Sequence, residues 1–476
     1  MKKISLFLLI LFQFSYAQER VLEFKTELNQ NSEVFNIVDE ENDNLALFTL
    51  KGRKIEALLF DNNFKKIGHI KPLKIPNKFD IFSGYIIKNK EVSLFLSNTT
   101  KTKFSKIVFH FDSGETNFTE LEIRLKEERF LESISYKNSF FIFSLPNSSE
   151  AIKLYKYTKD NSPSTTLIDF SESNYLNENN RPIKFNDLFT SYEGFSKITD
   201  IGIMQEGQPN SIEEASKNVK ILKQKNQLLV NLDKNHYFTY LLQINLDELT
   251  GDISRIAKPR FGKEMNHKAS NSFVLDHNLY QVITTKDALK FHIVNLKNNS
   301  VLNSHEVSKG EEIYFKNTPI VQEGGMYTSY REYEKTAKFF RKMKNLPIAI
   351  TARKKGEVYQ INLGSSLEVK SNPAMGMGMM GGALGAGMAS AMTIGFNPML
   401  TGYISYGYSR TVEINGLFDK NYKHIEGDIE PNIFNKIKKV SEKYRNVFAE
   451  TIFEKNGNYY WGGYNNFASV YNIYKI

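Results

Sequence analysis

Short apolar segments separated by polar turns run along almost the whole chain. The segments LFDNNFKKIG at 59–68 and LFDKNYKHIEG at 417–427 share one order: an apolar stretch, an Asp/Asn turn, and a stretch that mixes basic and apolar residues. Asn, Asp and Gly tolerate the left-handed backbone conformations that tight hairpins need. The pattern therefore predicts a chain of strand–turn–strand units.

Two kinds of turn alternate along the chain, one built on Asn, Lys or Gly and the other rich in Asp. Together they delimit six sets of four strands: residues 34–70, 82–125, 129–169, 218–257, 270–307 and 347–426. A seventh set has strands near 449–454, 459–464 and 468–474, and it lacks a fourth. Self-similarity of this kind is typical of a repeat architecture.

The N-terminal segment Val21–Leu28 alternates between apolar and polar residues and has no partner of its own. If it supplies the missing strand of the seventh set, the repeats close into a ring without free edges. We therefore predict an all-β fold, a single β-propeller of about seven four-stranded blades with a few peripheral helices. Two β-sandwich domains are the alternative, but they do not readily explain an unpartnered strand at each end of the chain.

The hydrophobic pattern also indicates how deeply each strand of a set is buried. Residues 45–48, 94–96 and 140–143 are apolar at every position, as expected for strands covered on both faces. Residues 120–125 alternate between charged and apolar side chains, as expected for an outer strand with one solvent-exposed face.

Three insertions interrupt the repeats of the predicted domain (18–476), at 170–217, 308–346 and 370–402. We expect short helices at 212–218, within 330–344 and within 428–447. In the helix within 330–344, the apolar residues at helical spacing are Tyr333, Ala337 and Phe340. The helix within 428–447 begins at Asp428 and Pro431, and its apolar residues are Ile433, Ile437, Val440 and Tyr444. The basic side of the second helix, formed by Lys335, Lys338, Arg341 and Lys342, is either a solvated face or a contact for an acidic partner or lipid headgroups.

An uncharged segment from Ser371 to Ser409 lies between two strands of the sixth set, and its first part is rich in Gly and Met. Four interpretations stay open: a flexible insertion, a contact segment with small-residue spacing, a buried apolar hairpin, or a soft-metal site. The last would use the thioethers of Met375, Met377, Met379 and Met380 as Cu(I) ligands. The end of this segment, Tyr403–Tyr408, has the composition of a strand.

The first 17 residues have the pattern of a secretory signal. Lys2 and Lys3 precede an apolar stretch at 4–14, which is too short for an ordinary membrane span, and Ser15-Tyr16-Ala17 resembles a cleavage site. With no Cys in the chain, neither a disulfide nor lipid attachment at Cys is expected. We predict a periplasmic protein, with secretion or surface association as alternatives, and no transmembrane span after removal of the signal.

Composition excludes some functions and leaves others open. The 476 residues carry a net charge of +9, spread along the chain, which does not predict a nucleic-acid-binding face. Their content of 41% hydrophobic residues is ample for a core.

No linear catalytic, nucleotide-binding or metal-binding motif is present, and the eight His residues are scattered. Most of these His residues are expected at the surface or at strand edges. The acidic run Asp39-Glu40-Glu41 is typical of a solvated turn. The sequence thus indicates no catalytic residue and no cofactor.

Our first functional hypothesis is a non-catalytic binding or scaffold protein of the bacterial envelope whose partner is another envelope protein, with its oligomeric state open. Deleting residues 373–398 is then expected to spare folding and weaken partner capture. The alternative is an envelope hydrolase or lyase that acts on a glycan or peptide from the central channel of the propeller. It predicts acidic or His side chains at one mouth of that channel.

Overall fold

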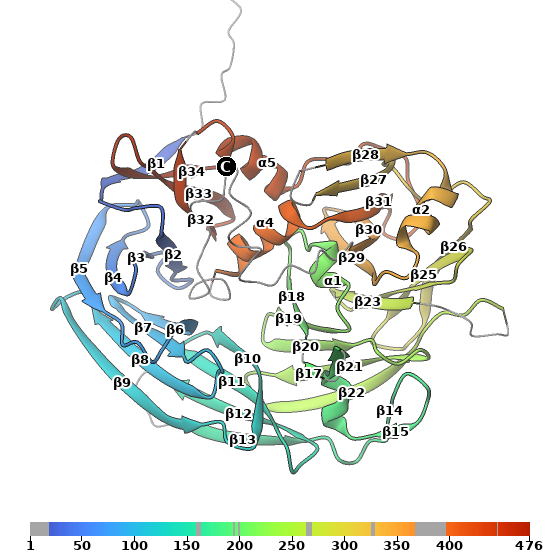
Figure 1. Ribbon diagram of the computed structural model, residues 1–476, viewed down its shortest axis with the longest axis horizontal. Coiled ribbons are helices and arrows are strands. Elements are labelled where there is room, and N and C mark those ends of the chain that lie inside the picture. The colour runs from blue at the N-terminus through green and yellow to red at the C-terminus, as the bar shows by residue number, and fades with distance from the viewer. Residues whose placement is uncertain are drawn as a thin grey trace, which may run out of the picture.

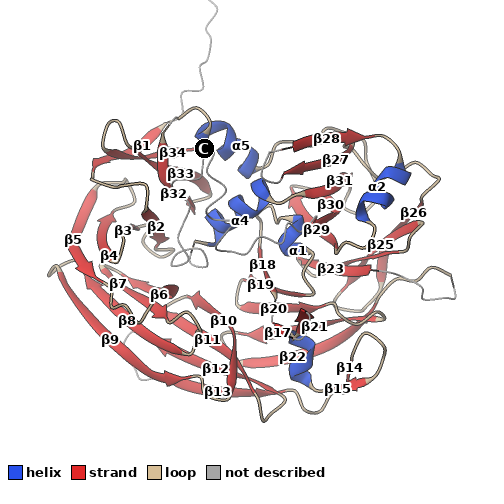
Figure 2. Cartoon of the chain, in the orientation of Figure 1, coloured by secondary structure: helices blue, strands red, loops and turns tan. Residues whose placement is uncertain are grey.

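The computed structural model describes residues 19–158, 163–193, 196–198, 200–262, 269–324, 329–366, 397–444 and 446–476. Most of this part of the chain is antiparallel β-sheet, with a few short helices (Figures 1 and 2). The predicted signal at 1–17 and the candidate ligands Met375, Met377, Met379 and Met380 lie outside the described residues.

Four sheets each contain four strands that follow one another directly in the chain. They comprise β2 (Ser32–Val38), β3 (Leu45–Lys51), β4 (Lys54–Phe60) and β5 (Lys66–Lys74); β6 (Ile81–Lys88), β7 (Glu91–Ser97), β8 (Lys103–His110) and β9 (Glu115–Arg124); β10 (Glu128–Tyr136), β11 (Ser139–Pro146), β12 (Ala151–Thr158) and β13 (Ser164–Asp169); and β23 (Ala269–Leu275), β24 (Asn278–Thr284), β25 (Ala288–Asn295) and β26 (Val301–Ser308). These are the predicted sets at 34–70, 82–125, 129–169 and 270–307.

A fifth set gains an extra strand at its inner edge. Strands β19 (Val219–Gln224), β20 (Gln227–Leu232), β21 (Phe238–Asn245) and β22 (Thr250–Ala257) form the predicted set at 218–257. Strand β18 (Ile201–Gln205) pairs with β19 in parallel. The segment before β18 holds small elements: β14 (Tyr175–Leu176) with β15 (Pro182–Ile183), the 3-10 helix η1 (Phe185–Phe189), and β16 (Ser191–Glu193) with β17 (Ser196–Ile198).

The first and last described strands pair with each other. Strand β1 (Arg20–Lys25) runs antiparallel to β34 (Val470–Lys475), with Glu23 opposite Asn472. It is the fourth strand of a sheet with β32 (Val447–Lys455) and β33 (Asn458–Asn465). The predicted pairing of the N-terminal strand with the seventh set is confirmed.

The sixth set departs from the prediction. Its sheet has the order β28-β27-β31-β30-β29, with β27 (Ile320–Gly324), β28 (Ser329–Tyr333), β29 (Ile348–Lys355), β30 (Val358–Ser366) and β31 (Thr411–Phe418). We expected all four strands within 347–426, which is wrong, because the strand beside β31 comes from the preceding insertion. Strand β27 pairs along the edge of β31 and places Val321 opposite Glu413.

The sheets follow one another around the molecule in chain order. In Figure 1, β2, β6 and β10 lie toward the middle and β5, β9 and β13 lie at the rim. Separate apolar clusters fill the spaces between successive sheets: Phe48 and Leu94 lie in one, and Phe95 and Phe140, whose stacked rings are 4.2 Å apart, in another. Strands β3, β7 and β11 are almost wholly buried, as their continuous apolar sequences predict.

Among the described residues, four α-helices pack against the sheets: α1 (Ile212–Ala215), α2 (Thr336–Met343), α4 (Pro398–Tyr408) and α5 (Ile433–Ser441). The prediction of a strand at Tyr403–Tyr408 is wrong. Asn397 accepts a hydrogen bond from the Leu400 N–H at 3.1 Å and Pro398 occupies the first turn, so Asn-Pro begins a helix there. No helix in the described ranges is both long enough and apolar enough to cross a membrane.

The apolar face of α2 differs from the predicted one, whereas that of α5 largely agrees with the prediction. In α2 the buried side chains are Thr336, Phe339, Phe340 and Met343, whereas Ala337 is exposed and Tyr333 belongs to β28. In α5, Ile433 and Tyr444 pack against the apolar cluster as predicted but are only partly buried, and Phe434, which was not predicted, is buried with them. Ile437 and Val440 are buried as expected, and they pack with Leu400 of α4 and Trp461 of β33.

Candidate functional site

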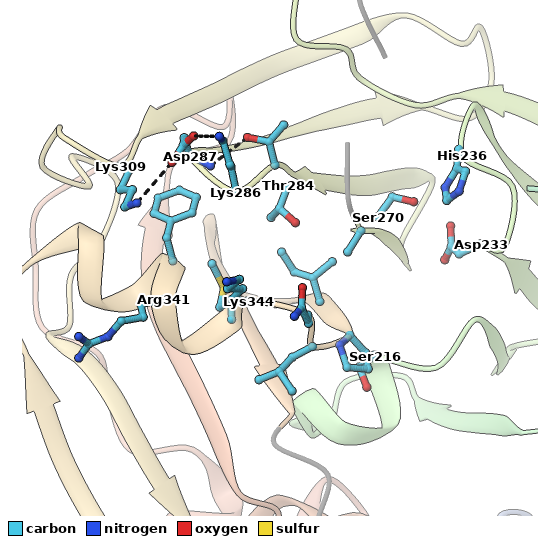
Figure 3. A pocket seen from close by; sticks show the side chains of 18 of the residues that line it. Ser216, Asp233, His236, Ser270, Thr284, Lys286, Asp287, Lys309, Arg341 and Lys344 are labelled. Atoms are coloured by element: carbon cyan, nitrogen blue, oxygen red, sulfur yellow. Dashed lines mark hydrogen bonds and ion pairs between the residues drawn. The ribbon is translucent and has the colours of Figure 1, made fainter. Parts of the chain in front are cut away.

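A cavity of about 1310 Å³ opens at one edge of the sheets that contain β19–β22, β23–β26 and β29–β31 (Figure 3). In an antiparallel meander, the start of the first strand and the turn between the second and third strands lie at the same edge. The cavity is lined by such segments: 216–218 and 269–270 before or at the start of first strands, and 233–236 and 284–287 in turns. The segment from α2 to the start of β29 closes its third side.

Basic residues outnumber acidic residues two to one in the lining. Eight Lys or Arg residues face four Asp or Glu residues: Lys217, Lys234, Lys286, Lys309, Lys335, Lys338, Arg341 and Lys344 against Glu178, Asp200, Asp233 and Asp287. The site therefore carries an excess of four positive charges. Concentrated in a concave site, such an excess attracts anions more strongly than the same charges spread over a convex surface.

The carboxylates of the lining are already engaged by lysines. Asp287 lies 3.4 Å from Lys309 and 3.7 Å from Lys286. Asp200 lies 3.3 Å from Lys217, and Glu178 lies 3.8 Å from Lys234. These pairs hold the rim in place and neutralise part of its charge.

The cations on the α2 side of the cavity, unlike the other cations of the rim, are not paired with carboxylates in the described part of the chain. They are Lys335, Lys338, Arg341 and Lys344. Helix α2 presents them because its other face, with Phe339 and Phe340, is buried in the core. This segment supplies the uncompensated charge of the site, and it contains three of the four basic residues that the sequence singled out. The fourth, Lys342, lies 5.6 Å from the centre of the Tyr333 ring.

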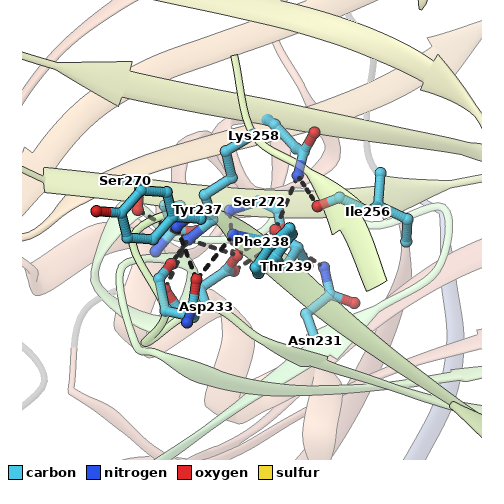
Figure 4. Close-up of polar contacts among 12 residues, drawn as sticks. Asn231, Asp233, Tyr237, Phe238, Thr239, Ile256, Lys258, Ser270 and Ser272 are labelled. Carbon is cyan, nitrogen blue, oxygen red and sulfur yellow. Dashed lines mark hydrogen bonds and ion pairs between the residues drawn. The ribbon is translucent and has the colours of Figure 1, made fainter. Parts of the chain in front are cut away.

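A buried ionic network forms the floor of the cavity (Figure 4). The Asp233 carboxylate, fully buried, lies 2.8 Å from the Lys220 ammonium and 3.7 Å from that of Lys258, whose side chains are 2% and 0% exposed. The Ser272 hydroxyl donates to Asp233 at 2.7 Å, and the Thr239 hydroxyl does so at the same distance. Paired charges with further hydrogen bonds are the form in which ions are tolerated in a protein interior.

The network shifts the pKa values of its members. Burial by itself raises the pKa of Asp233, but Lys220 and Lys258 outweigh this effect and hold it at about 2. Burial lowers the pKa of Lys258 to about 8, with Asp233 opposing the shift and Lys220 adding to it. The Asp233 carboxylate is thus shared by two ammonium groups, and burial makes the charged form of Lys258 less stable than that of a lysine in water.

Hydrogen bonds continue from the floor into the sheet of β23–β26. Gln281 donates to the Thr239 hydroxyl at 2.9 Å, and its carbonyl oxygen lies 2.7 Å from His292 Nε2. Burial lowers the pKa of His292 to about 4, so this imidazole is neutral near pH 7. We expected most His residues at the surface or at strand edges; His292 and His305 are instead buried.

The other residues named from the sequence do not form a site. Asp39 is 2% exposed and accepts hydrogen bonds from the Glu41 N–H and the Asn42 side chain, so it organises a turn, of which Glu40 and Glu41 are exposed. Across the described ranges, no three His, Asp or Glu side chains are grouped so that they could hold a metal ion.

Sequence reasoning missed the floor network altogether. A signal was present: polar residues interrupt strands that are otherwise apolar, as Lys220 does in VKIL at 219–222 and Gln281 does in YQVI at 280–283. A polar residue at a buried strand position needs a partner. Nothing in the sequence, however, shows that Asp233 and Lys258 are partners.

No protein-family model and no curated protein matches the chain. Solved structures match it at low similarity. A Synechocystis ACO mutant is 8% identical (TM-score 0.28, 56% of this chain and 58% of that chain). A Trypanosoma rangeli sialidase in complex with sialic acid is 9% identical, with a TM-score of 0.26, and the match covers 95% of this chain and 58% of that chain. The WD40 domain of SCAP from fission yeast is 10% identical, with a TM-score of 0.29, and the match covers 72% of this chain and 87% of that chain. The chain thus spans less than two thirds of the first two, and at these TM-scores nothing about this protein rests on them.

Proposed function

We propose that this protein is a binding protein that holds an anionic ligand in the cavity beside α2. The observation that carries the proposal is that the four cations of the 335–344 segment that line the cavity form no ion pair with a carboxylate among the described residues, although the other cations of the rim do. These four are Lys335, Lys338, Arg341 and Lys344. Cations held in a concave site without counter-charges favour anionic ligands.

The size and lining of the cavity favour an oligomer over a single small ion. Its volume of about 1310 Å³ exceeds the roughly 300–1000 Å³ of sites for drug-sized molecules. Ala337, Leu346 and Pro347 add exposed or half-buried apolar groups beside the charged ones. A short oligosaccharide carrying carboxylate, sulfate or phosphate groups matches this combination, since sugar rings offer apolar faces and polar edges.

We also propose that the seven large sheets close into a β-propeller in the bacterial envelope. The pairing of β1 with β34 supports closure, because it joins the two ends of the described chain in one sheet. The signal-like pattern at 1–17 supports export.

Calorimetric titration tests the binding role. The probes are trigalacturonate, the same trisaccharide as its neutral methyl ester, and a sulfated trisaccharide. We expect binding of at least one anionic probe, no binding of the ester, and weakening at high salt. The double variant Lys338→Glu/Arg341→Glu is expected to weaken binding at least tenfold.

The matched control is Lys436→Glu/Lys439→Glu on α5, which makes the same change in net charge on another exposed helix. It is expected to bind as the wild type does. Equal weakening by both double variants would show that only overall charge matters, and tight binding of the neutral ester would contradict the proposal.

A further inference from the structure

The amine of Lys258 belongs to the floor network and contacts Ser270, a residue of the cavity lining. Lys258 follows directly after β22, and its Nζ lies 2.7 Å from the carbonyl oxygens of Asp233 and Asn235 and 2.8 Å from Ser270 Oγ (Figure 4). Its side chain is fully buried. Ser270, at the start of β23, is half-buried and lines the cavity (Figure 3).

These three neighbours satisfy the amine in both of its protonation states. As an ammonium, Lys258 donates its three N–H groups to the two carbonyl oxygens and to Ser270 Oγ. As a neutral amine, it donates two N–H groups to the carbonyl oxygens, and its lone pair accepts the hydroxyl proton of Ser270. The site can therefore take a proton from Ser270 without leaving a buried polar group unpaired.

The charged groups around the amine set where it titrates. Burial lowers the pKa of Lys258 to about 8, Asp233 opposes this, and Lys220 adds to it. The charge of Lys258 in turn lowers the pKa of His236, after burial, which is the larger cause. A lysine base with a pKa near the working pH is well suited to general-base chemistry.

We propose that Ser270 and Lys258 form a nucleophile and general-base pair that hydrolyses an ester bound in the cavity. The anionic character of this ester rests on the proposed binding function; the serine–lysine chemistry does not. The pair supports a hydrolase whose site lies at the edge of three sheets.

The reaction balances with water as the only co-reactant. The Ser270 hydroxyl proton passes to Lys258 Nζ as Oγ attacks the ester carbonyl carbon. The tetrahedral intermediate collapses, the carbon–oxygen bond to the alcohol breaks, and the Lys258 ammonium protonates the departing alkoxide. Water then gives a proton to Lys258 and attacks the acyl-enzyme, and Ser270 Oγ leaves and regains its proton as the free acid forms.

The first test uses the absence of Cys from the chain. In the variant Ser270→Cys the only thiol lies beside the Lys258 amine, and in the control Ser216→Cys it lies elsewhere in the cavity lining. A neighbouring ammonium lowers a thiol pKa. The iodoacetamide rate, normalised to its high-pH limit, is therefore expected to have its midpoint at least one pH unit lower for residue 270 than for residue 216.

The second test measures the reaction itself by intact mass after treatment with a fluorophosphonate, and by hydrolysis of p-nitrophenyl acetate. The wild type is expected to gain one phosphonyl group and to hydrolyse the ester. Ser270→Ala is expected to lose both. Ser113→Ala, in the exposed turn between β8 and β9, is expected to keep both. Lys258→Met is expected to react at least a hundredfold more slowly while its circular dichroism spectrum stays unchanged.

The outcomes separate the two proposals. Coincident thiol titrations, or labelling that persists in Ser270→Ala, would overturn the nucleophile–base pair whether or not Lys258→Met folds. Trigalacturonate binding retained by Ser270→Ala would support the binding role independently. Loss of binding to every anionic probe, with Ser270 still labelled, would overturn only the binding role and with it the choice of an anionic ester.

Discussion

The aromatic ring of Phe24, in the first described strand, lies 5.5 Å from that of Tyr471, in the last. The same ring lies 6.0 Å from Phe60, in the strand β4 of the neighbouring sheet. Phe24 thus links β34 to the sheet that follows β1 in the chain. The two ends of the described chain are held together by side-chain packing as well as by backbone pairing.

Replacing Phe24 by Ala tests how much this packing stabilises the protein. Because the ring is only half-buried, we expect the free energy of unfolding to fall by about 2 kcal/mol, less than for a fully buried Phe. Urea denaturation measures this. Phe467→Ala is the control, since Phe467 is 80% exposed in the turn after β33, and it is expected to change little. Equal stability of the two variants would show that the β1 contact contributes nothing.

Replacing Asp233 by Asn tests the floor network. The variant leaves the buried ammonium groups of Lys220 and Lys258 without their shared carboxylate. Removing one partner of a buried ion pair destabilises a protein by about 3–5 kcal/mol. Thermal and urea unfolding are expected to show a loss of that order.

The control for this variant is Asp112→Asn, at an exposed pair with Lys90 whose ions are 2.8 Å apart. Exposed pairs contribute about 0–1 kcal/mol, so this variant is expected to unfold almost as the wild type does. A loss below about 1 kcal/mol for Asp233→Asn would mean that the buried lysines lose their charge at no cost.

Replacing Gly84 by Ala tests the packing between two sheets. A Cβ at this position in β6 would lie 2.4 Å from the Phe140 ring, which cannot retreat because it stacks on Phe95 at 4.2 Å. Overpacking of this kind costs about 1–3 kcal/mol. Gly310→Ala is the control, since nothing lies near its Cβ. A stable Gly84→Ala protein would show that the sheets separate easily.

The single tryptophan reports on the carboxyl group of the half-buried Glu450. Trp461 Nε1 donates a hydrogen bond to Glu450 Oε2 at 2.6 Å, and Trp461 is 1% exposed. Burial raises the pKa of Glu450 to about 7, although the hydrogen bond from Trp461 opposes the shift. Tryptophan fluorescence is therefore expected to change with a midpoint near pH 7, and the variant Glu450→Gln is expected to abolish this transition.

Stability follows the same group, with a defined sign. The folded protein binds the Glu450 proton more tightly than the unfolded chain does, so stability falls as pH rises from about 4.5 to about 7. The shift corresponds to about 3 kcal/mol. Glu450→Gln is expected to match the wild type at pH 5 and to exceed it at pH 8. A wild-type advantage at pH 8 would contradict the assignment.

Much of the sheet structure was predictable because strand ends and strand burial depend on residues that are close together in the sequence. The turn residues at 61–63 and 419–421 fix where strands end, and the all-apolar stretch at 45–48 marks a strand buried on both faces. The capping Asn397 was equally visible, but the aromatic and β-branched composition after it masked the helix of α4. The outer strands of the sixth set were missed because β27 and β28 have only five residues each and lie within 308–346, which was predicted to be an insertion.

By itself, the sequence determined the number and order of most strands, the depth at which they are buried and the partner of the N-terminal strand. Turn residues and hydrophobic periodicity depend on residues that are close together in the sequence, so they can be recognised from the sequence alone. Only the tertiary structure decided that Asp233, Lys258 and Ser270, from three separate strand ends, meet at the cavity that the cations of α2 also line. Such a site depends on which sheet edges face one another, and the free energy of a buried ion or a paired hydroxyl depends on that three-dimensional neighbourhood.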